Sequence, residues 1–110
     1  MQISNMTGVS GREIPNQFVI EEEGRGALGN FISRKTFQSY KSTIAIVTVW
    51  PQEALTKPDM KRVEVVLDEY YWDYSRTTGK YRNLFLGETK KETEAKIASG
   101  EYKLTNLNKD

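Results

Sequence analysis

The sequence predicts a small α+β domain, in which an antiparallel sheet of four to five strands carries two short helices on one face. Two observations predict this class. Apolar residues alternate with polar ones through much of the first two thirds of the chain, which is the period of a strand with one exposed face. In the last third the period changes to 3.6, which is typical of helices that bury one stripe. Helices that follow a run of strands pack together on one side of the sheet.

Four segments in the first two thirds have the composition of strands. The segment 42–50 gives the strongest signal, because its β-branched residues follow one another without a charge. This composition is typical of a central strand buried on much of both faces. Residues 51–60 are predicted as a loop, since Pro51 and Pro58 do not fit a central strand. Segment 62–67 is expected to pair antiparallel with 42–50 across that loop. The strands predicted in this part of the chain are 17–23, 31–40, 42–50 and 62–67.

The first helix is predicted by an apolar stripe and by the glycine that follows it. Tyr81, Leu84 and Phe85 recur at the i, i+3, i+4 spacing of one helical face. Gly87 stands where a helix commonly ends in the left-handed conformation, which glycine adopts without strain.

The second helix is predicted by its start signal. Thr89 and Glu92 have the spacing of a capping box, in which the hydroxyl and the carboxylate each accept a hydrogen bond from the other residue's backbone amide. This helix is expected to end before Gly100. Residues 101–105 alternate again and predict a last short strand.

Length and composition predict one folded domain behind a short arm. Residues 1–16 are rich in Ser, Asn, Gly and Thr and are expected to form a flexible N-terminal arm. Residues 17–110 are expected to form a single α+β domain, because one core typically occupies roughly 100–150 residues. No apolar run approaches the ~20 residues that span a bilayer, and the first residues do not resemble a signal peptide. We therefore expect a cytoplasmic protein with no membrane partner.

The residue types that are missing exclude several kinds of chemistry. The chain has no cysteine, which excludes disulfides, thiol nucleophiles and thiolate zinc sites. It also has no histidine, the commonest general base and the commonest metal ligand. The net charge of +1 gives no global field for nucleic acid or anionic lipid. We expect a protein that is not an enzyme and that uses no cofactor or metal.

Two motifs in the first third contain residue types that could carry chemistry. Residues 24–29 match G-x-G-x-x-G, but a dinucleotide site requires this loop to open a helix, and the residues that follow it are strand-like. Glu21, Glu22 and Glu23 supply oxygens that Mg²⁺ or Ca²⁺ would accept, yet nothing sets a ligand spacing. The simpler interpretation is a solvated strand that resists aggregation. The three glutamates also remain candidates for contact with a basic groove on a partner.

The segment 70–82 is the richest in side chains that bind. Its aromatic and basic residues favour three interpretations. The aromatic rings could close the core between sheet and helix. They could form a protein-docking hot spot, because Tyr, Trp and Arg dominate such sites. They could stack on unpaired bases while the cations meet phosphates. The candidate binding residues of the segment are Tyr71, Trp72, Tyr74, Arg76, Lys80 and Arg82.

The string Y-W-D-Y-S-R-T-T-G-K-Y-R-N-L-F-L-G at 71–87 resembles a domain of unknown function found in small proteins of phages and prophages of Gram-positive bacteria. Residues 37–45 and 99–104 are also similar to that domain, so the resemblance covers 17–107. The chain departs from it by a longer connection after Val49 and by an insertion at 24–30. The resemblance implies a phage or mobile-element origin and residence in the host cytoplasm, and it brings no catalytic residues.

These observations favour a non-enzymatic phage-type accessory protein that binds a host protein or ribonucleoprotein. An inhibitor of a host defence system, such as a CRISPR effector, is the form we expect. The alternative is a protein that binds single-stranded nucleic acid through the cluster at 70–82, and a small metal-dependent hydrolase comes third. The chain is expected to be a monomer or a homodimer, the latter if segment 42–50 lies at a sheet edge.

Overall fold

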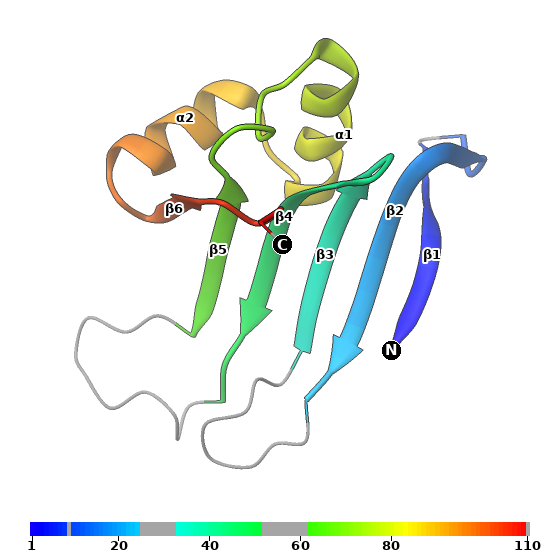
Figure 1. The fold of residues 1–110 in the computed structure, drawn as a ribbon, viewed down its shortest axis with the longest axis horizontal. Helices are drawn as coiled ribbons and strands as arrows, with labels where there is room; N and C mark the ends of the chain where they lie inside the picture. Colours follow the sequence, from blue (N-terminus) through cyan, green and yellow to red (C-terminus); the bar gives the residue numbers. More distant parts are fainter. Residues whose placement is uncertain (9, 25–32, 52–61, 110) are drawn as a thin grey trace.

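A computed structural model describes residues 1–8, 10–24, 33–51 and 62–109. They form one six-stranded mixed sheet in the order β1-β2-β3-β4-β5-β6, with two helices between the last two strands (Figure 1). The α+β class is confirmed, and the predicted count of four to five strands is corrected to six. The elements are β1 Gln2–Thr7, β2 Glu13–Glu23, β3 Ser33–Ser39, β4 Ser42–Val49, β5 Val63–Asp68, α1 Arg76–Leu86, α2 Lys90–Ala98 and β6 Tyr102–Thr105.

The sheet is antiparallel from β1 to β5 and parallel at its last pair. β4 and β5 pair antiparallel as predicted, with Val47 opposite Val65. β6 instead runs parallel to β5, with Tyr102 opposite Val65. The prediction of a purely antiparallel sheet is therefore wrong at this edge. Parallel neighbours need a long crossover connection, and α1 and α2 supply it.

The N-terminal residues differ from the predicted arm, because they contain β1 and the first part of β2. β1 pairs along β2, with Ile3 opposite Ile20. The Asn5 side chain also donates a hydrogen bond to the carbonyl of Ile14, at 3.1 Å. Met6 is buried and belongs to the core. The polar composition of 1–16 gives no apolar alternation from which this hairpin could be predicted. An edge strand is held by backbone pairing and does not need an apolar face of its own.

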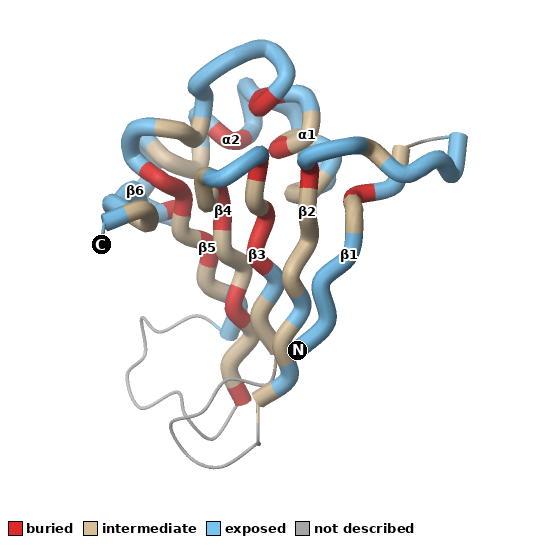
Figure 2. The backbone as a smooth tube through the Cα atoms, turned by 45° about the vertical axis from the view of Figure 1, so that its right-hand side comes forward, coloured by how far each residue is buried: buried red, intermediate tan, exposed pale blue. Residues whose placement is uncertain are grey.

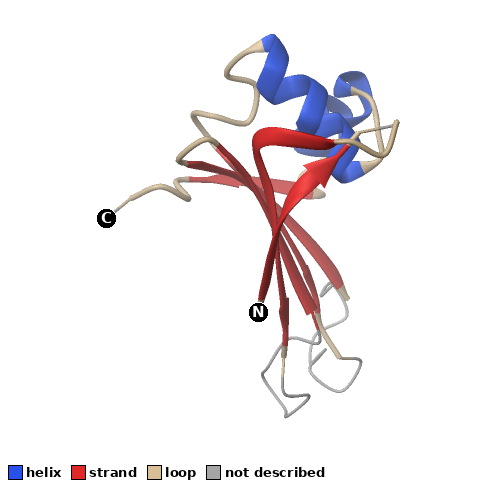
Figure 3. Cartoon of the chain, turned by 90° about the vertical axis from the view of Figure 1, so that its right-hand side faces the viewer, coloured by secondary structure: helices blue, strands red, loops and turns tan. Residues whose placement is uncertain are grey.

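The core lies between the middle strands and the helices. Figure 3 shows both helices on one side of the twisted sheet, and Figure 2 shows buried positions along the inner strands. Phe37 on β3 is fully buried and stacks on Phe85 of α1, with ring centroids 5.6 Å apart. Ala45 and Leu67 are also fully buried. β4 is a central strand, paired with β3 and β5. A homodimer was expected only if this strand lay at a sheet edge, and β4 does not lie there.

α1 has the predicted end but a different buried face. Gly87 ends the helix with φ 70°, in the left-handed region where glycine is favoured. Ser75 is the N-cap and accepts a hydrogen bond from the amide of Thr78. Leu84, predicted as part of the apolar stripe, is 44% exposed. Arg82 is fully buried instead, so a charged residue occupies a place that the apolar pattern does not show.

α2 begins as its sequence predicts. Thr89 is the N-cap, and both hydrogen bonds of the capping box with Glu92 are present. The helix ends at Ala98, and Gly100 follows with φ 84°. No helix in the described ranges is long and apolar enough to cross a membrane. The predictions for 24–30, 31–32 and 51–60 fall largely or wholly outside the described residues.

A buried carboxylate fastens α2 to the sheet. Glu88 accepts hydrogen bonds from Lys96 at 2.8 Å, from the Tyr102 hydroxyl at 2.7 Å and from the Thr93 hydroxyl. Burial alone would raise the pKa of Glu88, but the hydrogen bonds and the charge of Lys96 outweigh it and lower that pKa. Burial and the neighbouring carboxylate raise the pKa of Tyr102 to about 12. One side chain thus joins the start of α2, its last turn and β6.

Replacing Glu88 tests this connection. We expect Glu88→Ala to lower the free energy of unfolding by about 2 kcal/mol, because hydrogen bonds to a buried charged group are lost. Urea denaturation at pH 7 measures the change. Glu94→Ala on the exposed side of α2 is the matched control and should change stability by less than about 0.5 kcal/mol. Equal effects of the two variants would contradict the role of the network.

Candidate binding surface

The turn after β5 is built on the buried carboxylate of Asp68. One oxygen accepts the amides of Tyr70 at 3.1 Å and Tyr71 at 2.8 Å, and the other accepts the amide of Leu107 at 2.8 Å. Asp68 is only 1% exposed. Burial alone would raise the pKa of this carboxyl, but the hydrogen bonds outweigh it and lower that pKa. The ionised side chain therefore fixes the backbone on which the aromatic residues stand.

Three tyrosines pack on one another above this turn, and we call Tyr70, Tyr71 and Tyr74 the tyrosine cluster. The Tyr70 and Tyr71 rings meet edge to face with centroids 4.7 Å apart, and Tyr74 lies 5.3 Å from Tyr71. Tyr71 is half-buried against the core. Tyr70 and Tyr74 are 68% and 61% exposed. The cluster thus presents two exposed rings on a third ring that the core holds.

Two predicted binding residues, Trp72 and Arg82, belong to the interior instead. The Arg82 side chain is fully buried and donates hydrogen bonds to the Trp72 carbonyl, to Asp73 at 3.3 Å and to the Asn83 side chain at 2.9 Å. Its guanidinium also lies 5.1 Å from the centre of the Trp72 ring. Trp72 packs against the core cluster. These contacts agree with the core-closing interpretation for this pair, and not with direct contact between Arg82 and a large partner.

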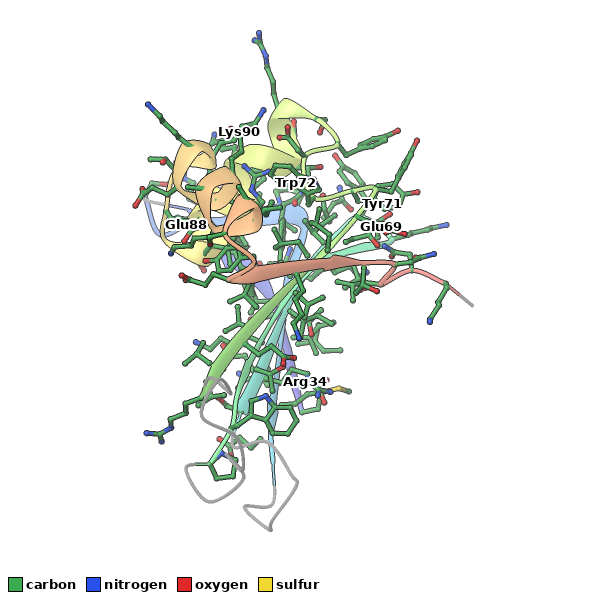
Figure 4. All side chains as sticks on the ribbon, turned by 90° about the vertical axis from the view of Figure 1, so that its left-hand side faces the viewer. Arg34, Glu69, Tyr71, Trp72, Glu88 and Lys90 are labelled. Carbon is green, nitrogen blue, oxygen red and sulfur yellow. The ribbon has the colours of Figure 1, made fainter. Side chains whose placement is uncertain are left out.

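Arg76 and Lys80 are exposed on α1 and line a shallow hollow of about 480 Å³, which we call the basic depression. Within the described ranges neither side chain forms an ion pair. Lys90, from the start of α2, reaches across to Asp73 at 2.7 Å. In the view of Figure 4, Lys90 and Tyr71 lie on opposite sides of Trp72. The lining residues are Asp73, Ser75, Arg76, Gly79, Lys80, Arg82, Asn83 and Lys90.

The glutamates predicted as partner contacts lie elsewhere. Glu21–Glu23 form the end of β2 that is far from the helices (Figure 1). Glu21 stands opposite Lys35 and Glu22 opposite Arg34 on β3, an arrangement of opposite charges that stabilises neighbouring strands. Across the described part of the chain, no three acidic side chains are placed to hold a metal ion. The structure therefore does not bring this triad together with the aromatic segment.

The interior position of Arg82 predicts a contrast with Arg76. We expect Arg82→Gln to lower the free energy of unfolding by about 3 kcal/mol, because the buried guanidinium is lost together with its hydrogen bonds to Trp72, Asp73 and Asn83. Arg76→Gln, on the exposed start of the same helix, should stay within about 0.5 kcal/mol of the unsubstituted protein. Urea denaturation at pH 7 compares the two. An Arg82 variant as stable as the Arg76 variant would contradict the buried contacts.

The Asp68 carboxylate predicts a pH dependence of the turn. Because its pKa is lowered in the folded protein, its contribution is present above the unfolded pKa of about 3.9 and is lost as the pH falls through the lowered value. Asp68→Asn should therefore lower stability by about 2 kcal/mol at pH 7 and make the remaining acid dependence weaker. Denaturation between pH 2 and 7, followed by near-ultraviolet circular dichroism of the tyrosines, measures both effects. An unchanged acid profile would contradict the assignment.

No curated protein and no solved structure matches the chain. A family model with the description "Family of unknown function (DUF8033)" matches residues 1–101, which include every strand and helix except β6. The chain therefore belongs to this family of unknown function.

Proposed function

We propose that the protein is a non-enzymatic binding protein that docks on a partner protein through the tyrosine cluster and the adjacent Arg76. One observation carries the proposal. Tyr70 and Tyr74 expose most of their surface, yet Asp68 holds the turn beneath them and Tyr71 anchors their rings. A folded protein gains little from keeping two large rings in water, so their fixed exposure suits a docking role.

The fixed geometry also favours affinity. Tyrosine buries a large area with few rotatable bonds, and it is enriched at interface hot spots. Because contacts within the cluster already restrict the rings, binding costs less conformational entropy than it would on a mobile loop. Arg76 and Lys80 add positive charge nearby, which would speed encounter with an acidic patch on the partner.

The partner class that we propose is a host macromolecule, a protein or a ribonucleoprotein. The resemblance of 71–87 to a domain of phage and prophage proteins supports a phage-type accessory role in the host cytoplasm. A component of a defence system, such as a CRISPR effector, fits this role. Inhibition would then come from occupying a surface and would need no catalytic group.

Single-stranded nucleic acid is the second candidate. Proteins hold unpaired bases on exposed aromatic faces and the phosphates with nearby cations, and Tyr74 directly precedes Ser75, the N-cap of the helix that carries Arg76 and Lys80. The net charge of +1 makes this candidate the weaker one, since such binding depends on phosphate neutralisation.

A double substitution in the tyrosine cluster tests the proposal. We expect Tyr70→Ala combined with Tyr74→Ala to lose at least tenfold in affinity for the host component that the unsubstituted protein captures, because the hot-spot rings are removed. Quantitative pull-down followed by titration of the purified component measures the loss. The matched control is Tyr40→Asn, which removes an exposed tyrosine at the turn between β3 and β4, where φ is 55° and asparagine is tolerated.

Three outcomes decide between the candidates. Loss of capture in the double variant, with capture kept in the control, supports protein docking. Equal capture by all three proteins contradicts it. Binding of a single-stranded oligonucleotide that weakens steeply with salt and depends on the same tyrosines would favour the second candidate instead.

A further inference from the structure

We propose that the open edge of β1 pairs with β1 of a second copy of this chain, so that two sheets join into one continuous sheet about a two-fold axis. Among the described residues β2 is the only neighbouring strand of β1 (Figure 1). This inference goes beyond the proposed function, because β1 is not part of the tyrosine cluster. It rests on the charge-free sequence of β1, on the contrast with the other sheet edge and on an apolar row that ends at Ile3.

The sequence of β1 lacks the side chains that usually keep an edge strand from pairing. Charged residues, above all lysine, and proline protect the edges of natural sheets. β1 contains neither a charged residue nor a proline. The two longest runs of the chain without a charged side chain are 1–11 and 42–52. The second run contains β4, which has a neighbouring strand on both sides, whereas β1, in the first run, has one on a single side.

The other edge of the sheet, β6, has the features of an edge that stays unpaired. It is four residues long and contains Lys103. A short strand with a lysine is a poor template for a further strand. β1 offers six residues, and its register shift lies past Asn5, so that Gln2–Asn5 pairs regularly with β2. Of the two edges, β1 is therefore the one suited to accept another strand.

A row of β-branched side chains crosses the sheet on the face opposite to the helices and stops at Ile3. Phe37 stacks on α1, so its neighbour Thr36 points to the opposite face, because successive side chains of a strand alternate. Ile3 ends the row with 60% of its surface exposed. Placing a second Ile3 beside it continues the row and removes apolar surface from water. The residues that stand opposite one another along the row are Ile3, Ile20, Thr36, Ile46 and Val66.

A two-fold axis through Ile3 also suits the backbone of β1. Along an antiparallel pair, hydrogen-bonded and non-hydrogen-bonded positions alternate, so a residue stands opposite a residue of the same kind. The axis meets this condition, because it sets Ile3 opposite Ile3 and Gln2 opposite Ser4 of the second copy. Since 1–11 has no charged side chain, no like-charged side chains of β1 meet across the axis. One pair of strands is small beside the roughly 1,600 Å² of a standard interface, so we expect a dimer that dissociates on dilution.

Sedimentation equilibrium of the full chain tests the proposal between about 10 µM and about 1 mM, the range in which weak complexes dissociate. We expect the mass to rise from one chain towards two with concentration. Ile3→Lys sets two ammonium groups opposite each other at the axis, so it should weaken dimerisation at least tenfold. Leu104→Lys, the same kind of change at an exposed position of β6, is the matched control and should dimerise like the unsubstituted protein. Circular dichroism checks that both variants are folded.

A cysteine at the axis gives a second readout that does not depend on weakening the dimer, because the chain has no cysteine of its own. Residues that face each other across antiparallel strands have Cβ atoms about 4.5–5.5 Å apart, close to the span of a disulfide. Under mild oxidation Ile3→Cys should therefore form a covalent dimer at least tenfold faster than Leu104→Cys.

Three results would overturn the proposal. The first is the mass of a single chain at every concentration. The second is a dimer that persists unchanged in Ile3→Lys, since it would use another surface. The third is covalent dimer that forms equally fast from Ile3→Cys and Leu104→Cys. Loss of tyrosine-dependent capture would leave all of these measurements unaffected, so the two proposals fail separately.

Discussion

The ionised carboxylate of Asp68 is the constraint on which the functional end of the molecule depends. It stands where β5 ends and receives three backbone amides, from Tyr70, Tyr71 and Leu107. The chain that follows Leu107 continues this anchoring, because the Asn108 side chain pairs with both backbone groups of Thr43. A single buried charge therefore joins the sheet, the aromatic turn and the C-terminal segment. Replacing it with a neutral side chain would loosen all three at once.

The aromatic and basic segment divides into an inner and an outer part. Arg82 and Trp72 stack inside, and Asp73 balances the charge of Arg82. Tyr70 and Tyr74 lie outside, where their rings contact each other and the ring of Tyr71. The inner part sets the position of α1, and thereby the direction in which Arg76 and Lys80 project. Residue types that look alike in the sequence thus have different tasks, which burial and hydrogen bonding separate.

The sequence predicted the local features well and the long-range ones poorly. The capping box at Thr89 and the helix end at Gly87 depend on neighbouring residues, and the pairing of 42–50 with 62–67 joins two strands that follow one another in the chain. The structure has all three features. The β1 edge and the parallel β6 pairing have no such local signal. Similarly, the composition of 70–82 predicts a binding segment but does not separate its inner residues from its outer ones. Arg82 of α1 and Lys90 of α2 share Asp73, and this arrangement depends on how α1 meets α2. No spacing in the sequence encodes that contact.

The parallel pairing of β6 with β5 has a consequence for how the protein reaches its final state. β1 to β5 are joined by short-range antiparallel neighbours and can assemble from local contacts. β6 can reach its position beside β5 only after the crossover has brought Tyr102 opposite Val65. Closing that long connection costs entropy before any strand pairing offsets it. The two helices of the crossover therefore have to be in place before β6 can pair with β5. The hydrogen bond from the Tyr102 hydroxyl to Glu88 then holds β6 against the start of α2.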